Sequence, residues 1–553
     1  TTNASAKGES IGIFYDDHFI SVPTVQQPIL NGDCVINGMS DFQGAEQLAT
    51  FIRVGAMKLQ LEELESSVVG AQLGSQALAT SLKAAVAGLA LVILFMIIMY
   101  GISGVSASVA LALYSVLVVE FIYWFEITLT LPGIAGIILG IGMAVDANVI
   151  IFARIREEIA QGKGVAVAIK EGYKKALSAI LDGQVTTFIA ALVLMVLGSG
   201  TVKGFAYTLM ISILLSLFTS LFVARYFMEA LYAVGLQSEK LYGRAKERKV
   251  INFMKHRVLY FVLSLVVIAS GIVGMVAYNA SGKGSLNYSL EFVGGTSTTA
   301  DFGKVYTIEE IESSVVPEVA EVIHDNTIQA TTISGTNQIM LKTRSLSLEE
   351  REALNTMLVE KFAVSEESIQ CQTISSTISG EMRSNAILAV LVSCVFMLLY
   401  IWIRFKDVRF ATSAIVALLH DVLVVLAAYA LLRISVGNTF IACMLTIVGY
   451  SINDTIVIFD RIRSNLHGST HHSREELAEI ANTSLTQTLS RTINTSITTI
   501  IMVLMLIILG VASIREFAIP LLVGLICGSY SSIFIATELW YVMKCRFGKN
   551  RAN

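Results

Sequence analysis

The sequence has little charge. Only 15% of its 553 residues are Asp, Glu, Lys or Arg, whereas soluble globular domains carry roughly 25%. Hydrophobic residues make up 54% of the chain, and the mean hydropathy is +0.69. This composition excludes an ordinary soluble protein and predicts a membrane protein. Because the formal net charge is only −4, the distribution of charge along the chain is more informative than its sum.

The motifs of common enzymes are also missing. The sequence contains no phosphate-binding loop, no GxSxG and no HExxH. Its six cysteines form no CxxC pair, which argues against a disulfide framework. His467, His471 and His472 lie together in one polar loop, but we expect no zinc site there. We therefore expect no enzyme, no bound cofactor or metal and no nucleic-acid partner, so any energy input must come from an ion gradient.

Eleven apolar runs are close to the ~20 residues that cross a bilayer. They are residues 86–102, 104–125, 132–152, 184–200, 204–229, 258–278, 385–403, 410–432, 438–459, 494–512 and 517–543. If the runs alternate in direction, five clusters of Lys and Arg fall on one side of the membrane. Positive charge marks the cytoplasmic side. We therefore expect a cytoplasmic C-terminus, with residues 1–80 and 279–384 outside.

The outer segment 284–381 predicts a small α+β domain. Two capping boxes, TIEE at 307–310 and SLEE at 347–350, each open an amphipathic helix. The strand-like runs around them are 286–302, 327–334, 337–344 and 369–378. The resulting order, βαββαβ, predicts a ferredoxin-like domain.

The two halves of the chain repeat each other. Four pairs of segments align: GMAVDANVIIFARIR (142–156) with GYSINDTIVIFDRIR (449–463), QVTTFIAALVLMVLG (184–198) with SITTIIMVLMLIILG (496–510), residues 70–100 with 376–402, and Phe205 with Phe517. Both copies begin on the same side of the membrane. We therefore expect a polytopic α-helical membrane protein with two parallel, pseudo-symmetric five-helix repeats and one extra span. Parallel repeats are related by an axis along the membrane normal, with the coupling site at their interface.

Two carboxylates interrupt the repeated spans. A carboxylate within a span costs at least ~2.5–3.5 kcal/mol, so it marks a functional site by default. In the alignment Asp146 matches Asn453, and Asp454 lies one position further on, which is ~100° around a helix. Arg491 follows on the next span, and pairing with an Asp would lower the cost of burying both charges. Protonation of the Asp would release the Arg, which is a switch that an ion gradient could drive.

Further polar residues share these spans. They are Asn148, Asp182, Gln184, Thr186 and Thr187 in the first repeat, and Asn453, Thr455, Asn494, Thr495, Ser496, Thr498 and Thr499 in the second. Their alternative role is to hold helices together, and this alternative weighs most for Asp182 and for the hydroxyl residues. Arg154, Arg156, Arg461 and Arg463 mainly fix the topology.

Several of these stretches resemble a known family. TLPGIAGIILGIGMAVDANVIIFARIREE (130–158), VGAQLGSQAL (69–78) and VKGFAYTLMISILLSLFTSLFVAR (202–225) resemble SecD. LEFVGGT (290–296), STISGEMRSNAI (376–387), LLHDVLVV (418–425), GYSINDTIVIFDRIR (449–463) and SRTINTSITT (490–499) resemble SecF. Over nearly all of its length the chain is identified as a member of the fused SecDF family, within the resistance-nodulation-division superfamily.

This resemblance implies an accessory protein of the SecYEG channel in the bacterial plasma (inner) membrane. Its substrates would be SecA-driven preproteins, its further partners YajC and YidC, and its surroundings membrane lipid. Protons, or in some bacteria sodium ions, would drive it. The resemblance assigns ion coupling to Asp146, Asp454 and Arg491. It also identifies Phe292, Gly294 and Gly295 as the FxGG motif, where glycine lets the backbone turn or approach closely.

The chain departs from the family pattern at several places, and two of these departures affect its interpretation. The usual first span and most of the large outer SecD domain have no counterpart, and residues 1–80 show only strands near 11–23, a helix near 41–54 and a strand near 57–64. We therefore expect an N-terminal part outside this chain. The usual Leu-Asp-Ala-Asn is Leu-Asp-Gly-Gln at 181–184, which weakens a role for its polar pair. The competing functions are a structural scaffold of the translocon and a small-molecule exporter of the same superfamily.

The expected domains follow from these segments. They are 1–80, a partial outer base domain of SecD type; 84–230, a SecD-like five-span repeat; 231–257, a basic cytoplasmic linker; 258–278, the first SecF-like span; 279–384, the outer ferredoxin-like domain; 385–543, a SecF-like five-span repeat; and 544–553, a basic cytoplasmic tail.

Overall fold

The computed structural model describes eleven stretches of the chain. They are residues 7–15, 18–29, 34–39, 41–55, 64–68, 71–243, 249–282, 284–325, 328–333, 336–466 and 473–547. The chain forms two units, Thr1–Glu63 and Leu64–Asn553. In the first unit β1 (Ile13–Tyr15) pairs antiparallel with β2 (His18–Ser21), and α2 (Phe42–Gly55) follows, as the sequence predicts. The strand predicted near 57–64 lies almost entirely outside the described residues.

The second unit contains, among its described residues, eleven helices long and apolar enough to cross a membrane, which confirms the predicted number. They are α3 (Ala71–Tyr100), α4 (Ile102–Trp124), α5 (Leu131–Ala160), α6 (Val165–Leu197), α7 (Thr201–Phe218) continued by η1 (Thr219–Val223) and α8 (Ala224–Ala233), α10 (Arg257–Ala280), α15 (Ser376–Phe405), α16 (Val408–Leu432), α17 (Asn438–Asn465), α18 (Arg474–Leu509), and α19 (Ala512–Ser531) continued by η5 (Ser532–Ala536) and α20 (Thr537–Phe547). Helices α6 and α18 begin well before the predicted spans. Hydropathy marks only their apolar halves, whereas the helices continue into polar sequence.

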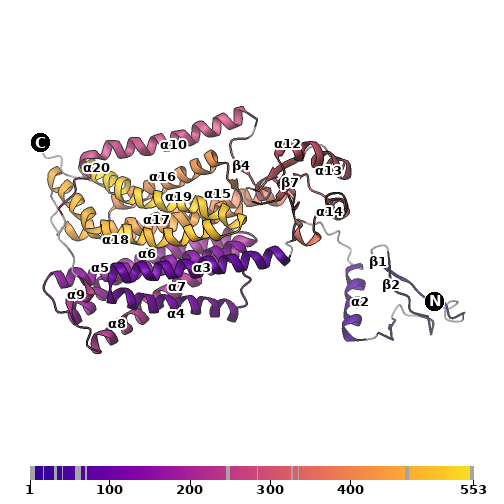
Figure 1. The fold of residues 1–553 in the computed structure, drawn as a ribbon, viewed down its shortest axis with the longest axis horizontal. Coiled ribbons are helices and arrows are strands. Elements are labelled where there is room, and N and C mark those ends of the chain that lie inside the picture. Colours follow the sequence, from indigo (N-terminus) through magenta and orange to yellow (C-terminus); the bar gives the residue numbers. More distant parts are fainter. Residues whose placement is uncertain are drawn as a thin grey trace. The chain divides into compact units, whose positions relative to one another are not determined.

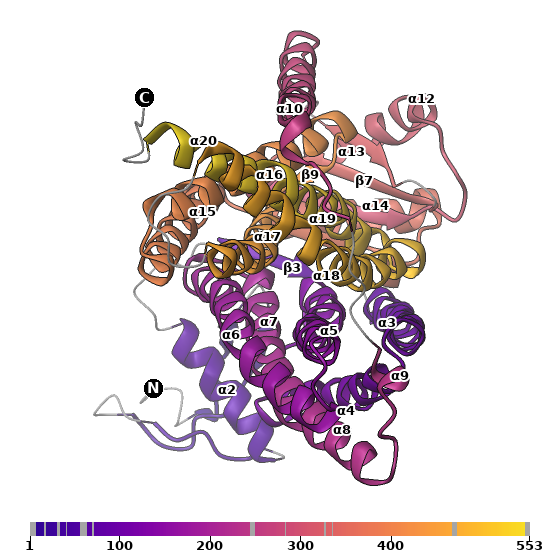
Figure 2. The ribbon, with the colours of Figure 1, turned by 90° about the vertical axis from the view of Figure 1, so that its left-hand side faces the viewer.

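The helices form the two predicted repeats, α3–α8 and α15–α20, as Figures 1 and 2 show. Between the repeats, α5 packs against α18 and α17 packs against α6. Helix α10 lies at the periphery and packs on α16. The π-helical turns η1 and η5 lie at equivalent places in the last span of each repeat. We call the end of the bundle from which residues 284–375 extend the domain end, and the opposite end the basic end.

A five-stranded antiparallel sheet lies at the domain end (Figure 1). Its order is β3-β8-β5-β7-β6, with β3 (Glu65–Val68), β5 (Gly295–Asp301), β6 (Gln329–Thr332), β7 (Gln338–Thr343) and β8 (Gln370–Ile374). Strands β5 to β8 have the ferredoxin-like order that the sequence predicts. The helices α12 (Ile308–Glu310), η3 (Ile311–Val315), α13 (Val316–Ile323) and α14 (Leu348–Phe362) complete this domain, and both predicted capping boxes form.

The strands β3 and β8 occupy equivalent positions in the two repeats. Each directly precedes a first span, α3 or α15, and the alignment of residue 70 with 376 places Glu65 opposite Cys371 and Val68 opposite Ile374 in sequence. In the sheet Glu65 pairs with Ile374 and Val68 pairs with Cys371. Exchanging the two repeats therefore leaves this ladder unchanged, as in a two-fold symmetric contact. The pseudo-symmetry axis passes through the ladder, a feature that the sequence analysis did not foresee.

The predicted strand 286–302 is wrong as one element. The structure divides it into β4 (Asn287–Tyr288), the short helix α11 (Leu290–Val293) and β5. The break occurs because Gly294 and Gly295 have φ of +82° and +118°, values that side chains rarely adopt. A Cβ on Gly295 would lie 2.4 Å from the carbonyl oxygen of Thr343. The FxGG motif thus turns the chain into the sheet, while the buried Phe292 joins the core of the helix bundle.

The domain is also joined to the helix that carries Asp454. Strand β4 pairs in parallel with β9 (Ser435–Val436), which directly precedes α17. The backbone N–H of Ser289 donates to the carbonyl of Val436 at 3.0 Å. At Gly437 an added Cβ would lie 2.0 Å from the hydroxyl oxygen of Ser289, so the two segments are in close contact. A movement of the first turn of α17 would therefore displace β9 and, through its pairing with β4, the domain.

The first turn of α14 provides a test by pH. The Arg344 guanidinium, followed by the backbone N–H of Ser347, lowers the pKa of Glu350 from its ordinary 4.5 to about 2. A lowered pKa stabilises the fold above pH 4.5, and this stabilisation is lost as the pH falls from 4.5 towards 2. We expect hydrogen exchange of the α14 amides, corrected for intrinsic rate, to accelerate between pH 6 and pH 3. The Glu350→Gln protein should lack this acceleration, whereas Glu360→Gln at the far end of α14 should keep it. Equal acceleration in all three proteins would contradict the assignment.

Candidate functional site

The two repeats meet along a seam, which we define as the contacts of α5 with α18 and of α17 with α6. An added Cβ on Gly142 of α5 would lie 3.0 Å from the Cα atom of Thr499 on α18. An added Cβ on Gly449 of α17 would lie 3.2 Å from the Cα atom of Thr187 on α6. The alignment pairs Gly142 with Gly449 and Thr187 with Thr499. The same glycine-on-threonine contact therefore occurs twice, and each glycine lets two backbones approach closely.

The axis between the repeats also passes beside an aromatic pair. Phe205 and Phe517 are equivalent in the alignment, and their ring centroids lie 5.4 Å apart in an edge-on arrangement. A residue that contacts its own equivalent lies on the symmetry axis. Both rings are buried. The seam is therefore a dry, tightly packed contact, and polar groups within it have little water to solvate them.

The charges in the seam break this symmetry. Asn453 faces α6 at Gly183, where an added Cβ would lie 1.8 Å from the amide oxygen Oδ1 of Asn453. Asp146, the equivalent of Asn453, lies on α5, which packs on α18. The residues on α18 that match Ala179, Asp182 and Gly183 are Arg491, Asn494 and Thr495. At equivalent positions of the two contacts, α18 therefore carries Arg491 and α6 carries Ala179.

The structure brings Asp146, Asp454 and Arg491 together on this charged side. All three are buried, with 2%, 6% and 7% of their surface exposed. Asp454 lies beside Thr495 and within electrostatic range of both Arg491 and Asp146. The expected ion pair is not formed in this structure, because no described carboxylate lies within 4.0 Å of Arg491. Among the described residues, Oδ1 of Asp146, Oδ2 of Asp454, and Nε and Nη2 of Arg491 have no hydrogen-bond partner.

The other predicted polar residues surround this group. Nδ2 of Asn148 donates to the carbonyl of Ala144 at 3.3 Å, and its Oδ1 has no hydrogen-bond partner in the part of the chain that the structure describes. The Thr495 hydroxyl donates to the carbonyl of Thr492 at 2.9 Å. Asn494 donates to the hydroxyl of Tyr100 on α3 at 2.8 Å. Asn494 therefore ties α18 to α3, whereas the bonds of Asn148 and Thr495 stay within their own helices.

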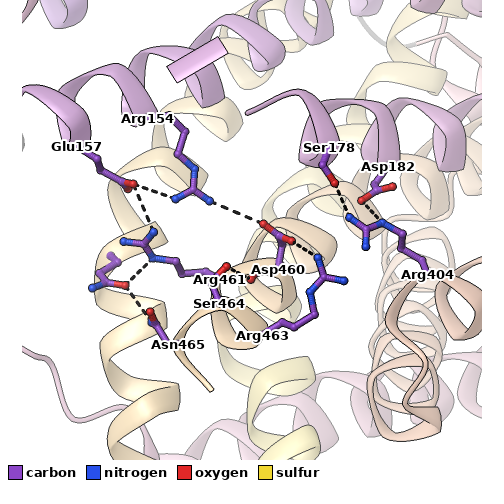
Figure 3. Close-up of polar contacts among 11 residues, drawn as sticks. Arg154, Glu157, Ser178, Asp182, Arg404, Asp460, Arg461, Arg463, Ser464 and Asn465 are labelled. Atoms are coloured by element: carbon purple, nitrogen blue, oxygen red, sulfur yellow. Dashed lines mark hydrogen bonds and ion pairs between the residues drawn. The ribbon is translucent and has the colours of Figure 1, made fainter. Parts of the chain in front are cut away.

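Asp182 lies in a separate group. Its Oδ2 accepts from Nε of Arg404 on α15 at 2.6 Å, and its Oδ1 accepts from the Tyr400 hydroxyl at 2.8 Å. Arg404 also donates to Ser178. Figure 3 shows this group apart from the residues at the ends of α5 and α17. The ion-coupling role expected for Asp182 stays a prediction, and its geometry is that of a neutralised ion pair between the repeats.

Beyond Arg491, towards the basic end, a layer of ion pairs spans the seam (Figure 3). Glu157 at the end of α5 accepts from Nη1 of Arg461 on α17 at 3.3 Å, and Nη2 of Arg154 on α5 lies 3.8 Å from Asp460 on α17. Arg154 and Arg461 are equivalent in the alignment. In each repeat, the same arginine therefore pairs with a carboxylate of the other repeat. Between this layer and Arg491 lies a cavity of about 10 Å³, roughly the space for one water molecule. This layer, which we call the ion-pair layer, therefore covers Arg491 on its basic side.

Sequence reasoning missed part of this site. Arg154 and Arg461 were expected mainly to fix topology, whereas their carboxylate partners Glu157 and Asp460 were not singled out. The signal was an acid close to each F-x-R-I-R motif, but a motif within one helix cannot show which partner lies across the seam. The loop with His467, His471 and His472 lies outside the described residues.

Comparison with protein families matches most of the chain. The model described as "Protein export membrane protein SecD/SecF, C-terminal" matches residues 52–233 and 354–546. A second model, "SecDF, P1 head subdomain", matches residues 1–59. This second match describes residues 1–59 as a head subdomain, whereas the sequence predicted the base of such a domain over residues 1–80.

Individual relatives agree with these models. The protein translocase subunit SecDF of Bacillus subtilis is 34% identical over 550 residues, which cover 96% of this chain and 72% of that protein. The SecDF subunit of Thermus thermophilus is 35% identical over 546 residues, covering 98% and 72%. The crystal structure of SecDF from Thermus thermophilus, described as a translocon-associated membrane protein, has a TM-score of 0.82 at 32% identity and covers 99% of this chain and 73% of that one.

The close contact of Gly183 with Asn453 provides a test of the seam. We expect Gly183→Ala to lower the free energy of unfolding by about 1 kcal/mol, because the added methyl group overpacks the contact. Asn453→Ala in the same protein should restore most of this loss, because it removes the atom that the methyl group meets. Thermal unfolding of the purified protein in detergent measures both effects. Gly380→Ala on α15, with nothing within 4 Å of the added Cβ, is the matched control. The seam contact would be refuted if Asn453→Ala gave no relief.

Proposed function

Because the chain belongs to the SecD/SecF family of protein export membrane proteins, we propose that it is an accessory subunit of the Sec translocon driven by an ion gradient. It promotes the export of unfolded preproteins across the bacterial plasma membrane and their release outside. The coupling ion is the proton, with sodium as the alternative, and no bound cofactor takes part. Its partners are the SecYEG channel and SecA-driven preproteins, with YajC and YidC as further partners.

The distribution of charge supports one orientation. Arg154, Arg461 and Arg463 lie at the basic end, whereas the five-stranded sheet lies at the opposite end. Because Lys and Arg favour the cytoplasmic side, the basic end faces the cytoplasm and the sheet domain faces outside. A preprotein that leaves the channel would then meet the sheet domain.

One observation carries the proposal: Asp454 and Arg491 are both buried at the seam, and among the described residues Oδ2 of Asp454 and Nε and Nη2 of Arg491 have no hydrogen-bond partner. An isolated buried ion has an effective penalty of several kcal/mol. Two arrangements lower this penalty. Either the carboxylate takes up a proton and becomes neutral, or the two side chains move together and form an ion pair. Each arrangement favours a different fit of α17 against α18, so proton uptake and release on Asp454 bias the relative position of the two repeats.

The ion-pair layer closes the ion path on its cytoplasmic side. In the present arrangement it covers Arg491 on the cytoplasmic side, leaving a cavity of about 10 Å³ between them. A proton can leave to the cytoplasm only if the pairs between α5 and α17 separate. Alternating access then consists of opening this layer while the opposite side of the seam closes.

A movement of α17 reaches the outer domain because only short segments of the chain separate them. Strand β9 directly precedes α17 and pairs with β4, which leads into the FxGG motif and β5. The short helix α11 packs against α15, the first span of the second repeat. A shift of α17 relative to α15 therefore changes the tilt of the sheet domain, which is how ion flow would move a bound preprotein.

The decisive experiment compares ion-driven translocation in wild type and Asp454→Asn. Each protein is reconstituted with the SecYEG channel and SecA in proteoliposomes, and preprotein uptake is measured with and without an imposed proton gradient. We expect the gradient to accelerate translocation in wild type and to have no effect in Asp454→Asn, because asparagine cannot carry the proton. Replacing the proton gradient by a sodium gradient identifies the ion.

The matched control is Asp407→Asn. Asp407 is a carboxylate at the basic end of α16, paired with Arg409 and Lys544 away from the seam, and its loss should leave the gradient effect intact. Asp182→Asn tests the remaining predicted carboxylate in the same assay. If Asp454→Asn responded to the gradient as wild type does, ion coupling at this site would be wrong and a scaffold role would remain.

The ion-pair layer yields a second prediction. Glu157→Gln removes the negative charge that pairs with Arg461 across the seam and should increase passive proton entry into proteoliposomes severalfold, measured with a trapped pH-sensitive dye. Asp407→Asn is the control, because Asp407 pairs with Arg409 and Lys544 away from the seam. Equal proton entry in the two variants would show that the layer does not close the path.

A further inference from the structure

A buried acid lies in the last span of the second repeat, outside the seam. Glu538 is the second residue of α20, and 0% of its surface is exposed. Among the described residues, neither of its carboxyl oxygens, Oε1 and Oε2, has a hydrogen-bond partner. Asp421 on α16 is equally buried, but it accepts from the hydroxyls of Ser451 and Ser531 and lies 3.0 Å from Nδ1 of His420. Glu538 is therefore buried without the donors that a carboxylate requires.

The repeated architecture does not require this buried acid. The equivalent helix of the first repeat, α8, carries one acid, Glu229, which is exposed and pairs with Arg225 at 3.0 Å. In both repeats a π-helical turn, η1 or η5, directly precedes the helix. A π turn adds a residue to the helix and so rotates the residues after it by ~100° about the axis. Without η5, α20 would present a different face to the protein, and such turns are frequent at functional sites.

The ionisable groups near Glu538 belong to α10 and to the end of α19. Arg257 and Tyr260 on α10 and Tyr530 on α19 lie within electrostatic range of its carboxyl group. The Tyr530 hydroxyl donates to the backbone carbonyl of Tyr260 at 2.9 Å. The guanidinium of Arg257 lies over the ring of Tyr541, 5.7 Å from its centroid, and is not within the 4.0 Å of an ion pair with Glu538. An acid and an arginine are thus close to each other without touching, as they are at the seam.

The other helices that pack against α20 bring no free charge to this place among the described residues. Asp407 at the start of α16 pairs with its neighbour on α16 and with Lys544 on α20. The charges at the end of α17 belong to the ion-pair layer. Helix α18 contributes the uncharged Asn482, which accepts from two backbone amides just before α10. Arg257 is therefore the cation that Glu538 can reach by a small movement.

We propose that Glu538 is a second proton-binding site of this protein, which holds its proton in the arrangement described here and pairs with Arg257 once the proton leaves. An ionised carboxylate at this place would have a penalty of several kcal/mol, and a bound proton removes the charge. Ionisation draws Arg257, the first residue of α10, towards α20. Helix α10 leads to β4 and so to the outer domain. Only a use of this proton in transport rests on the proposed function; its presence on Glu538 does not.

Infrared spectroscopy of the full chain tests whether Glu538 is neutral. The purified protein is kept at pH 7 in a detergent without ester groups, so that the absorption of neutral carboxyl groups is not covered. We expect the difference spectrum of wild type minus Glu538→Gln to contain the band of one neutral carboxyl group and no carboxylate band. Glu229→Gln, at the exposed acid of the equivalent helix, is the matched control and should remove carboxylate bands only.

This measurement needs neither the channel nor a gradient, so its outcome is independent of the transport assays. Carboxylate bands in the difference spectrum of Glu538→Gln would show that Glu538 is ionised and would overturn the proposal. If Glu538→Gln does not fold, Glu538→Leu, which also lacks a carboxyl group, provides the reference spectrum.

The same difference spectra, recorded at rising pH, test the pairing with Arg257. Arg257→Gln removes the positive charge that favours ionised Glu538, so the neutral band should persist to higher pH than in wild type. Lys255→Gln changes an exposed cation two residues earlier, and its band should disappear at the same pH as in wild type. Equal persistence in the two variants, or a band that never disappears while the protein stays folded, would overturn the pairing.

Discussion

The burial of opposite charges that do not touch is the constraint on which the rest of this structure depends. Asp454 and Arg491 lie in a seam where glycine brings the backbones of neighbouring helices close together, so little water can solvate them. Close packing makes the charges expensive, and the charges make the packing sensitive to a single proton. A loosely packed, hydrated seam would tolerate both protonation states equally and could not distinguish them. If ions are coupled at this site as we propose, the small residues of the seam are as much a part of it as the ionisable ones.

The repeated architecture supplies two equivalent contacts, and only one of them is charged. Gly142 on Thr499 and Gly449 on Thr187 are the same contact made twice. On one side the chain places Arg491 and Thr495; on the other it places Ala179 and Gly183, with Asn453 filling the space. In the proposed mechanism, an ion that binds on the charged side would displace that side relative to the other. The uncharged side would not respond to the ion, so the difference between the two contacts would give the movement its direction.

The sequence predicted the features that depend on local pattern. Apolar length identified the eleven spans, the TIEE and SLEE boxes identified two helix starts, and the alignment identified the repeats. It also selected Asp146, Asp454 and Arg491, because ionisable residues in apolar runs are conspicuous. The same reasoning failed to single out His420 and Asp421, although they interrupt an apolar run in the same way. What it could not predict were partners distant in sequence: Arg461 with Glu157, Asp182 with Arg404, and β3 with β8. The break of the predicted strand 286–302 was readable in the two glycines, but their backbone angles depend on Thr343 and Ser376, which are far along the chain.

The ladder of β3 and β8 has a mechanical meaning beyond its place in the sheet. Its centre lies on the axis that relates the repeats, and each of its strands leads directly into the first helix of one repeat. When two bodies rotate about an axis, points on that axis move least. If the repeats rock as we propose, the ladder would be the pivot of the movement, and its backbone hydrogen bonds could persist. The peripheral strand β6, at the other edge of the same sheet, would then have the longest lever arm. A small rotation within the membrane would become a larger displacement at that edge of the domain.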